Sequence, residues 1–174
     1  LLLLVFPLLT QAQFTQNDSI RGGYGQTRNW WDVIHYDLSV TFDSQQKSIS
    51  GKNSIRFQLL TIPENARIQI DLQAPLIIDS ILLWSNLKDS LSTVRLAFTR
   101  SNNIALAQLD KSISKGQQFG ITIFYHGVPK EAIRPPWDGG WIWKKDANGQ
   151  PWMSVACQGL GASVWYPCKD HQSD

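Results

Sequence analysis

The chain has 174 residues, a formal net charge of +2, 17% charged residues and 11% aromatic residues. A chain of this length can bury one sizeable core. Its charges are dispersed and nearly balanced, which excludes the basic stripe that is typical of nucleic-acid-binding proteins. Its aromatic content excludes a largely disordered chain, because disordered segments are poor in aromatic residues. We therefore expect a folded domain without a nucleic-acid partner.

Residues 1–9 are almost purely apolar, and the small and polar residues 10–13 follow them. This order is typical of the apolar centre and the cleavage region of a secretory signal peptide. The run is shorter than the roughly 20 residues that a membrane-spanning helix needs. We expect residues 1–13 to be part of a signal peptide, which makes the protein secreted or periplasmic with no stable membrane span. A buried N-terminal strand is the alternative.

The sequence after this leader predicts an irregular arm over residues 14–29 and strands from Trp30 onward. Residues 34–42 alternate strictly between apolar and polar, which indicates a strand with one buried face. A turn at residues 43–47 leads into a strand over residues 48–60, in which Ile55, Phe57 and Leu59 share one face. Gly51 within this strand indicates a bulge or a bend.

Further strands are predicted at short intervals, and no window shows a long helical period. They cover residues 67–72, 76–84, 93–98, 103–109 and 119–126. An irregular aromatic loop at residues 134–140 precedes a hairpin of residues 141–143 and 151–158, with Asn148 and Gly149 in its turn. Many short strands between turn signals predict an all-β class, an antiparallel sandwich or a barrel.

The segment 152–170 concentrates unusual residues: both cysteines, a Gly-x-Gly turn at Gly159 and Gly161, and a Trp-Tyr-Pro-Cys-Lys-Asp run. Gln158 lies where the predicted strand stops, a position from which its side chain can be presented to a ligand. Cys157 and Cys168 flank the turn. They are either two free buried thiols or a pair across the turn, since spacing alone does not establish disulfide geometry.

The sequence contains no catalytic or metal-binding constellation of its own. Its three histidines, His35, His126 and His171, form no His-Glu-x-x-His pair, and the two cysteines lack metal-finger spacing. It has no Gly-x-Ser-x-Gly elbow and no phosphate-binding loop. We therefore expect these residues alone to catalyse no reaction.

Two motifs nevertheless resemble a known family over residues 30–174. Trp31-Asp-Val-Ile-His-Tyr-Asp-Leu-Ser-Val40 is similar to the first-strand motif of the N-terminal domain of aminopeptidase N-like zinc metallopeptidases, which include leukotriene A hydrolase. Ala156-Cys-Gln-Gly-Leu-Gly-Ala-Ser-Val-Trp-Tyr-Pro-Cys-Lys-Asp170 resembles the family's Gln/Glu segment that leads into Trp-Phe-Pro-Cys-x-Asp. The Pro-Pro-Trp-Asp-Gly-Gly run and the Trp-Lys-Lys-Asp hairpin resemble the Bacteroidetes-type branch.

The resemblance implies a saddle-like antiparallel β-sandwich that packs on a thermolysin-like catalytic domain, with the sequence ending before that domain. It implies zinc-dependent removal of N-terminal residues from peptides, with Zn2+ bound by the missing downstream domain. In the family, a Gln or Glu nine residues before the motif's proline binds the free α-amino group of the substrate, and Gln158 is nine before Pro167. Gly159, Gly161 and Ala162 would then keep the backbone close to the substrate.

Two other functions remain open on the sequence. A relative that kept the sandwich but lost the metal site would act as a non-catalytic interaction scaffold. A tryptophan-rich β-sandwich would bind carbohydrate by stacking sugar rings on exposed side chains such as Trp137 and Trp141. The peptidase hypothesis is preferred because one spacing accounts for Gln158, the Gly-x-Gly turn and the Pro-Cys corner together.

Overall fold

The computed structural model describes residues 23–87, 90–109 and 118–171. Over these ranges the chain forms ten strands and one short 3-10 helix, η1 (Ala162–Val164), and no α-helix. The all-β class predicted from the sequence is confirmed. The proposed signal peptide, residues 1–13, lies outside the described residues. No helix of the described ranges is long and apolar enough to cross a membrane.

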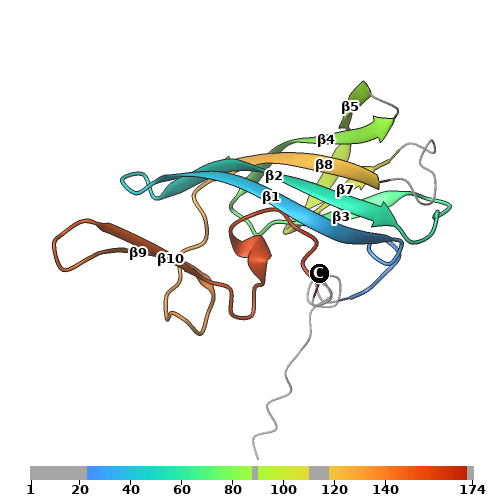
Figure 1. Cartoon of the computed structure of the whole chain (residues 1–174). Coiled ribbons are helices and arrows are strands. Elements are labelled where there is room, and N and C mark those ends of the chain that lie inside the picture. The colour runs from blue at the N-terminus through green and yellow to red at the C-terminus, as the bar shows by residue number, and fades with distance from the viewer. Residues whose placement is uncertain (1–22, 88–89, 110–117, 172–174) are drawn as a thin grey trace, which may run out of the picture.

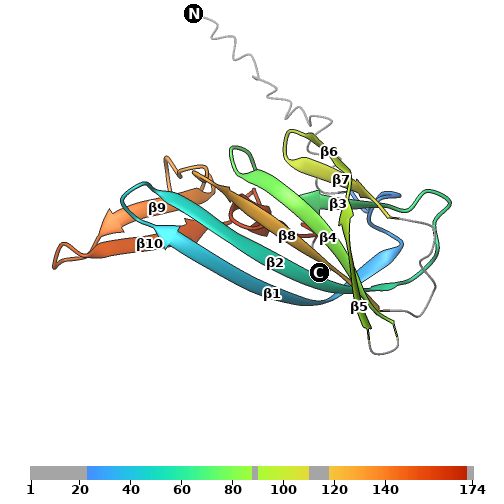
Figure 2. The same cartoon turned by 90° about the horizontal axis from the view of Figure 1, so that it is seen from above.

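The described residues form two antiparallel sheets and a separate hairpin (Figure 1). The larger sheet has the order β1 (Trp31–Asp43), β2 (Ser48–Leu59), β8 (Gln118–Gly127), β4 (Ile77–Leu87), β5 (Ser90–Leu96). The smaller sheet has the order β3 (Arg67–Asp71), β7 (Ile104–Gln108), β6 (Phe98–Ser101). The hairpin pairs β9 (Gly140–Lys145) with β10 (Pro151–Ala156). Seen from above, the hairpin extends past the end of the sandwich near the β1–β2 turn (Figure 2).

The core lies between the inner faces of the two sheets. On β2, Ile55 and Phe57 are fully buried and Leu59 is nearly so, as the period-two pattern predicted. The smaller sheet contributes Ile68 and Ile70, which are also fully buried. Each large apolar side chain buried in this way stabilises the fold by about 1.5–3 kcal/mol. These contacts hold the two sheets face to face.

The strand β1 departs from the simple alternation because its bulge lies where the sequence did not place it. The register shifts between Val33 and His35, so Ile34 is the extra residue and is 43% exposed. Of the bulge or bend predicted at Gly51, the bulge is wrong, since β2 pairs with β1 in continuous register there. A Cβ at Gly51 would lie 2.3 Å from the backbone oxygen of Ser39, so glycine allows the close approach of β1.

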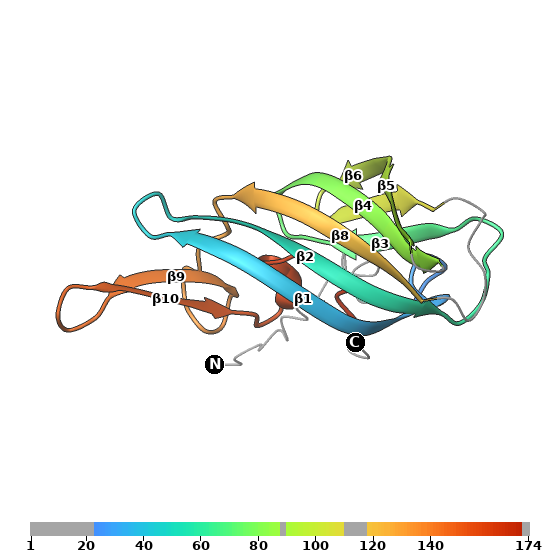
Figure 3. The ribbon, with the colours of Figure 1, turned by 45° about the horizontal axis from the view of Figure 1, so that its top comes forward.

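Two predicted strand boundaries are also wrong. The strand expected over residues 93–98 is two strands, because the chain leaves β5 in the larger sheet at Ala97 and enters β6 in the smaller sheet. The strand expected to reach Gln158 ends at Ala156, because residues 157–161 form a turn. The short helix η1 lies between the hairpin and the smaller sheet, below β1 and β2 in Figure 1 and behind them in Figure 3.

Candidate functional site

The four residues predicted to contact substrate lie in one tight turn that follows β10. The backbone N–H groups of Leu160 and Gly161 both donate to the Cys157 carbonyl, at 3.1 and 2.9 Å. Gly159 and Gly161 have φ angles of 68° and 73°, in the left-handed region that favours glycine. The break predicted at the Gly-x-Gly segment is therefore present, and Ala162 continues it as the first residue of η1.

Gln158 is exposed on this turn. Among the described residues, none forms a hydrogen bond with its side-chain amide. Its backbone oxygen packs against the preceding loop, because a Cβ at Gly139 would lie only 2.5 Å from it. The turn thus fixes the backbone of Gln158 and leaves its amide, with one carbonyl acceptor and two N–H donors, open to a ligand.

A buried polar chain behind the turn was not predicted from the sequence. The hydroxyl of Ser163 donates to Asp170 Oδ2 at 2.6 Å, and Gln73 Nε2 donates to Ser163 Oγ at 3.0 Å. The backbone N–H of Asp170 donates to Asp71 Oδ2 at 3.1 Å. Asp71 in turn is paired with the fully buried guanidinium of Arg28. The chain connects the turn to β3 and to the segment before β1.

Asp71 is the electrostatic centre of this network. Burial raises the pKa of its carboxyl above the ordinary value, and the charge of Arg28 and the hydrogen bonds from Gln69 and Asp170 act in the opposite direction. Gln69 Nε2 donates to Asp71 Oδ1 at 3.0 Å. The paired charges explain how an arginine and an aspartate are tolerated in the core.

Lys169 joins the two sequence motifs that carried the resemblance. It is buried, its ammonium donates to the Trp31 backbone oxygen at 2.9 Å, and it lies 4.9 Å from the centre of the Trp31 ring. Cys168 and Asp71 are also joined by two backbone hydrogen bonds of 2.8 and 3.0 Å. The motif of residues 156–170 is therefore packed against the sandwich through Cys168 and Lys169.

Both cysteines are free thiols in the structure, Cys157 exposed and Cys168 buried. Burial, reinforced by the nearby Asp170 carboxylate, raises the pKa of both thiols. Burial also raises the pKa of Tyr166 to about 12. Raised values keep these groups protonated at neutral pH, so none is an activated nucleophile.

The buried Trp141 packs with the partly buried Trp143 and Trp165, whereas Trp137 and Trp152 are exposed. Trp141 is 3% exposed, stacks on Trp143 with ring centres 4.9 Å apart, and meets the edge of Trp165 at 6.3 Å. Trp141 therefore offers no exposed ring to a sugar, contrary to its use in the carbohydrate hypothesis. Trp137 is 78% exposed and Trp152 is 50% exposed.

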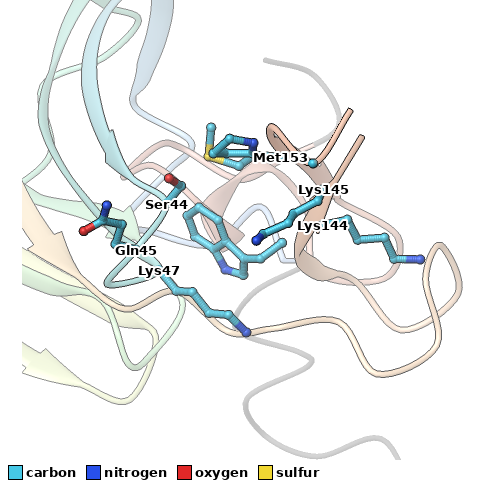
Figure 4. Close-up of a pocket in the computed structure, with 9 residues that line it drawn as sticks. Ser44, Gln45, Lys47, Lys144, Lys145 and Met153 are labelled. Atoms are coloured by element: carbon cyan, nitrogen blue, oxygen red, sulfur yellow. The ribbon is translucent and has the colours of Figure 1, made fainter. Parts of the chain in front are cut away.

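A groove of about 630 Å³ lies away from the predicted residues, between the β1–β2 turn and the hairpin (Figure 4). Its lining includes Ser44, Lys47, Trp143, Lys144, Lys145 and Met153. The ammonium of Lys47 is paired with Glu131 at 2.9 Å. None of the residues predicted to contact substrate belongs to this groove.

The described residues contain no group of three or more His, Cys, Asp or Glu side chains that could hold a metal ion. His35 is exposed on β1, as the sequence predicted. His126 Nδ1 lies 2.8 Å from a carboxylate oxygen of Asp79 at the surface, and the His171 ring packs 4.9 Å from Tyr24. A zinc ion therefore does not fit the described part of this chain.

Among solved structures, those of M1 zinc metallopeptidases contain a domain with the same β-sandwich fold as this chain. The M1 zinc metallopeptidase of Deinococcus radiodurans superposes with a TM-score of 0.62 and 19% identity, over 88% of this chain and 32% of that one. Leukotriene A4 hydrolase of Saccharomyces cerevisiae gives a TM-score of 0.58 and 16% identity, over 82% of this chain and 21% of that one. The sandwich fold implied by the resemblance is confirmed.

A third similar structure contains a bound substrate. It is an M1 zinc metallopeptidase mutant from Deinococcus radiodurans bound to a Tyr-Ser-Ala substrate, with a TM-score of 0.61 and 21% identity over 88% of this chain. The present chain spans about a third of the length of the metallopeptidases that it matches. No protein-family model and no curated protein matches the sequence.

Proposed function

We propose that this chain is the N-terminal, substrate-anchoring domain of a secreted or periplasmic zinc metallo-aminopeptidase. The observation that carries the proposal is the exposed Gln158 on a hydrogen-bonded turn, within a sandwich that superposes on M1 zinc metallopeptidases. Zinc and the groups that activate water would belong to a catalytic domain outside these 174 residues. Packing against that domain and binding of a peptide with a free N-terminus are part of the proposal.

In this function Gln158 would bind the α-amino group of the substrate. Its carbonyl oxygen is an acceptor for an ammonium group, although it carries no charge. The open space around Gly159 and the small side chain of Ala162 would let the peptide approach the turn, while the missing Cβ at Gly161 makes room for the Asp170 carboxylate behind it. Anchoring the amino group fixes the distance from the N-terminus to the scissile bond, which is how an exopeptidase removes one residue at a time.

The proposal predicts that Gln158→Ala in the complete enzyme raises the KM for free-amine peptides and lowers turnover. A hydrogen bond to a charged group is worth about 1.5–3 kcal/mol, which corresponds to a roughly 10- to 100-fold loss in kcat/KM. Gln158→Glu should lower KM, because a carboxylate makes a charge-assisted contact with the ammonium. Steady-state kinetics with several peptides provides the measurement.

Gln150→Ala is a matched control, because Gln150 is an exposed glutamine at the tip of the β9–β10 hairpin, away from the 157–161 turn. It should leave kcat/KM unchanged. Unchanged kinetics for Gln158→Ala would remove Gln158 from the binding site. Reading the coding sequence beyond Asp174 tests the enzyme itself: a His-Glu-x-x-His motif with a downstream Glu supports it, and its absence favours the non-catalytic scaffold.

One observation favours the carbohydrate-binding alternative. Trp137 is 78% exposed on a loop whose conformation is held by Asp138, which accepts hydrogen bonds from the backbone of Ile133 and Arg134 at 2.6 and 3.0 Å. A rigid exposed ring is the feature on which sugars stack. Retention on a polysaccharide column that is lost with Trp137→Ala would support this function.

A further inference from the structure

The carboxylate of Asp170 lies directly against the turn that carries Gln158. A Cβ at Gly161 would come within 2.2 Å of both Asp170 oxygens, so only glycine lets the carboxylate occupy this place. Gly159, two residues earlier, has a similar positive φ, but a Cβ there would meet no atom within 4 Å. The two glycines therefore share a positive φ and differ in their contact with Asp170.

Asp170 is itself fixed from two sides. Its side chain accepts the hydrogen bond from the buried Ser163 hydroxyl, and Ser163 is bound through its backbone oxygen to the Gln73 N–H at 2.8 Å. Its backbone N–H donates to Asp71, which belongs to β3. The carboxylate thus joins Ser163 of η1 to the turn at Gly161, and the backbone N–H of the same residue joins this point to β3.

Gln158 depends on this support because its own side chain has no hydrogen bond to any described residue. The place of its amide therefore depends on the backbone of residues 157–161, which packs against the preceding loop at Gly139. Binding residues on loops work when a rigid scaffold and supporting hydrogen bonds hold them within a fraction of an ångström. Asp170 lies at the point where the turn enters η1, between Gly161 and the Ser163 hydroxyl.

We propose that Asp170 is a positioning residue, which holds the 157–161 turn and thereby sets the place of the Gln158 amide toward the substrate amino group. The inference rests on the proposed function for its kinetic consequence. Its structural part, control of the turn by Asp170, can be measured on this chain without any activity.

The structural part is tested by amide hydrogen exchange. Asp170→Ala should accelerate exchange of the Leu160 and Gly161 amides, which donate to Cys157, by at least about tenfold through more frequent local opening. Asp43→Ala is the matched control, since Asp43 caps the β1–β2 turn by accepting from the backbone of Gln45 and Gln46 at 2.9 Å. Equal exchange of Leu160 and Gly161 in the two variants would overturn the proposal.

The kinetic part is tested by a double-variant cycle in the complete enzyme. If Asp170 acts through Gln158, Asp170→Ala alone should lower kcat/KM by about 10- to 100-fold, mainly through KM, and Gln158→Ala/Asp170→Ala should be no worse than Gln158→Ala. Asp170→Asn keeps an oxygen acceptor for Ser163 and should recover most of the loss. Independent effects that multiply in the double variant would overturn the positioning role.

The two proposals fail in different ways. If Gln158→Ala has no kinetic effect, the anchoring function is wrong, and the exchange experiment still decides whether Asp170 holds the turn. If Gln158→Ala is impaired while Asp170→Ala keeps normal kinetics and normal exchange, the anchoring function stands and the positioning role is wrong. Gly161→Ala should cost more stability than Gly159→Ala, and Asp170→Ala should remove that difference.

Discussion

Replacing Arg28 with methionine removes one half of the buried ion pair that supports the site. The guanidinium of Arg28 is fully buried and the carboxylate of Asp71 is 1% exposed. Methionine retains much of the apolar stem, so the change mainly deletes the charge and its hydrogen bonds. One of those bonds runs from Arg28 Nη1 to the Gly23 carbonyl at 3.0 Å.

The expected loss is large because Asp71 would remain buried without its cation. Breaking a buried ion pair by removing one partner costs about 3–5 kcal/mol. This is a substantial part of the roughly 5–15 kcal/mol that stabilises a typical domain. For a chain of this size, the melting temperature should fall by about 10 °C.

The loss should also depend on pH through Asp71. Burial already raises the pKa of Asp71, and the Arg28 charge that opposes this shift is absent in the variant. The folded variant therefore binds the Asp71 proton more tightly than the unfolded chain does. Stability falls as pH rises through the folded pKa and is regained as pH falls, so the deficit of Arg28→Met should be smaller at about pH 5 than at about pH 7.5.

Urea unfolding followed by tryptophan fluorescence measures these free energies at both pH values. Lys47→Met is the control, because the Lys47–Glu131 pair is about half exposed and should contribute less than about 1 kcal/mol. Arg28→Met combined with Asp71→Leu should recover much of the loss. The reasoning is refuted if Arg28→Met costs no more than Lys47→Met, or if its cost is the same at the two pH values.

Two further predictions concern the core and the thiols. A Cβ at Gly120 would lie 1.9 Å from the Trp84 ring, so Gly120→Ala should destabilise the domain by about 1–3 kcal/mol in urea unfolding, whereas Gly25→Ala, with open space around it, should change little. In the native protein one thiol, Cys157, should react with a thiol reagent, more slowly at about pH 8 than free cysteine because its pKa is raised, and Cys168 should react only after unfolding. Rapid reaction of two thiols in the folded chain would contradict this.

The sequence predicted the strands best where one face is buried along the whole strand. On β2, the alternation of Ile55, Phe57 and Leu59 matches their burial, because side chains on a strand point to opposite faces in turn. The prediction failed at Ala97, where the chain passes from the larger to the smaller sheet between the apolar residues Leu96 and Phe98. Periodicity records burial and does not say which of two sheets buries a residue.

The candidate site was also only partly predictable from the sequence. The Gly-x-Gly turn was predictable, because Gly159 and Gly161 are local signals for positive φ. The buried network behind that turn was not predictable, because its ion-paired residues Arg28 and Asp71 are 43 residues apart in sequence. The residues that neighbour a buried arginine or aspartate in sequence do not indicate which residue will pair with it.

By itself, the sequence determined the all-β class, most strand positions, the tight turn and the family that the chain resembles. Only the tertiary structure decided which polar residues are buried together, as for Lys169 and Trp31, which are 138 residues apart. Strand periodicity and turn chemistry depend on neighbouring residues, and a sequence displays these directly. Buried pairing depends on which segments the folded sheets bring into contact, and that is fixed by the packing of the whole domain.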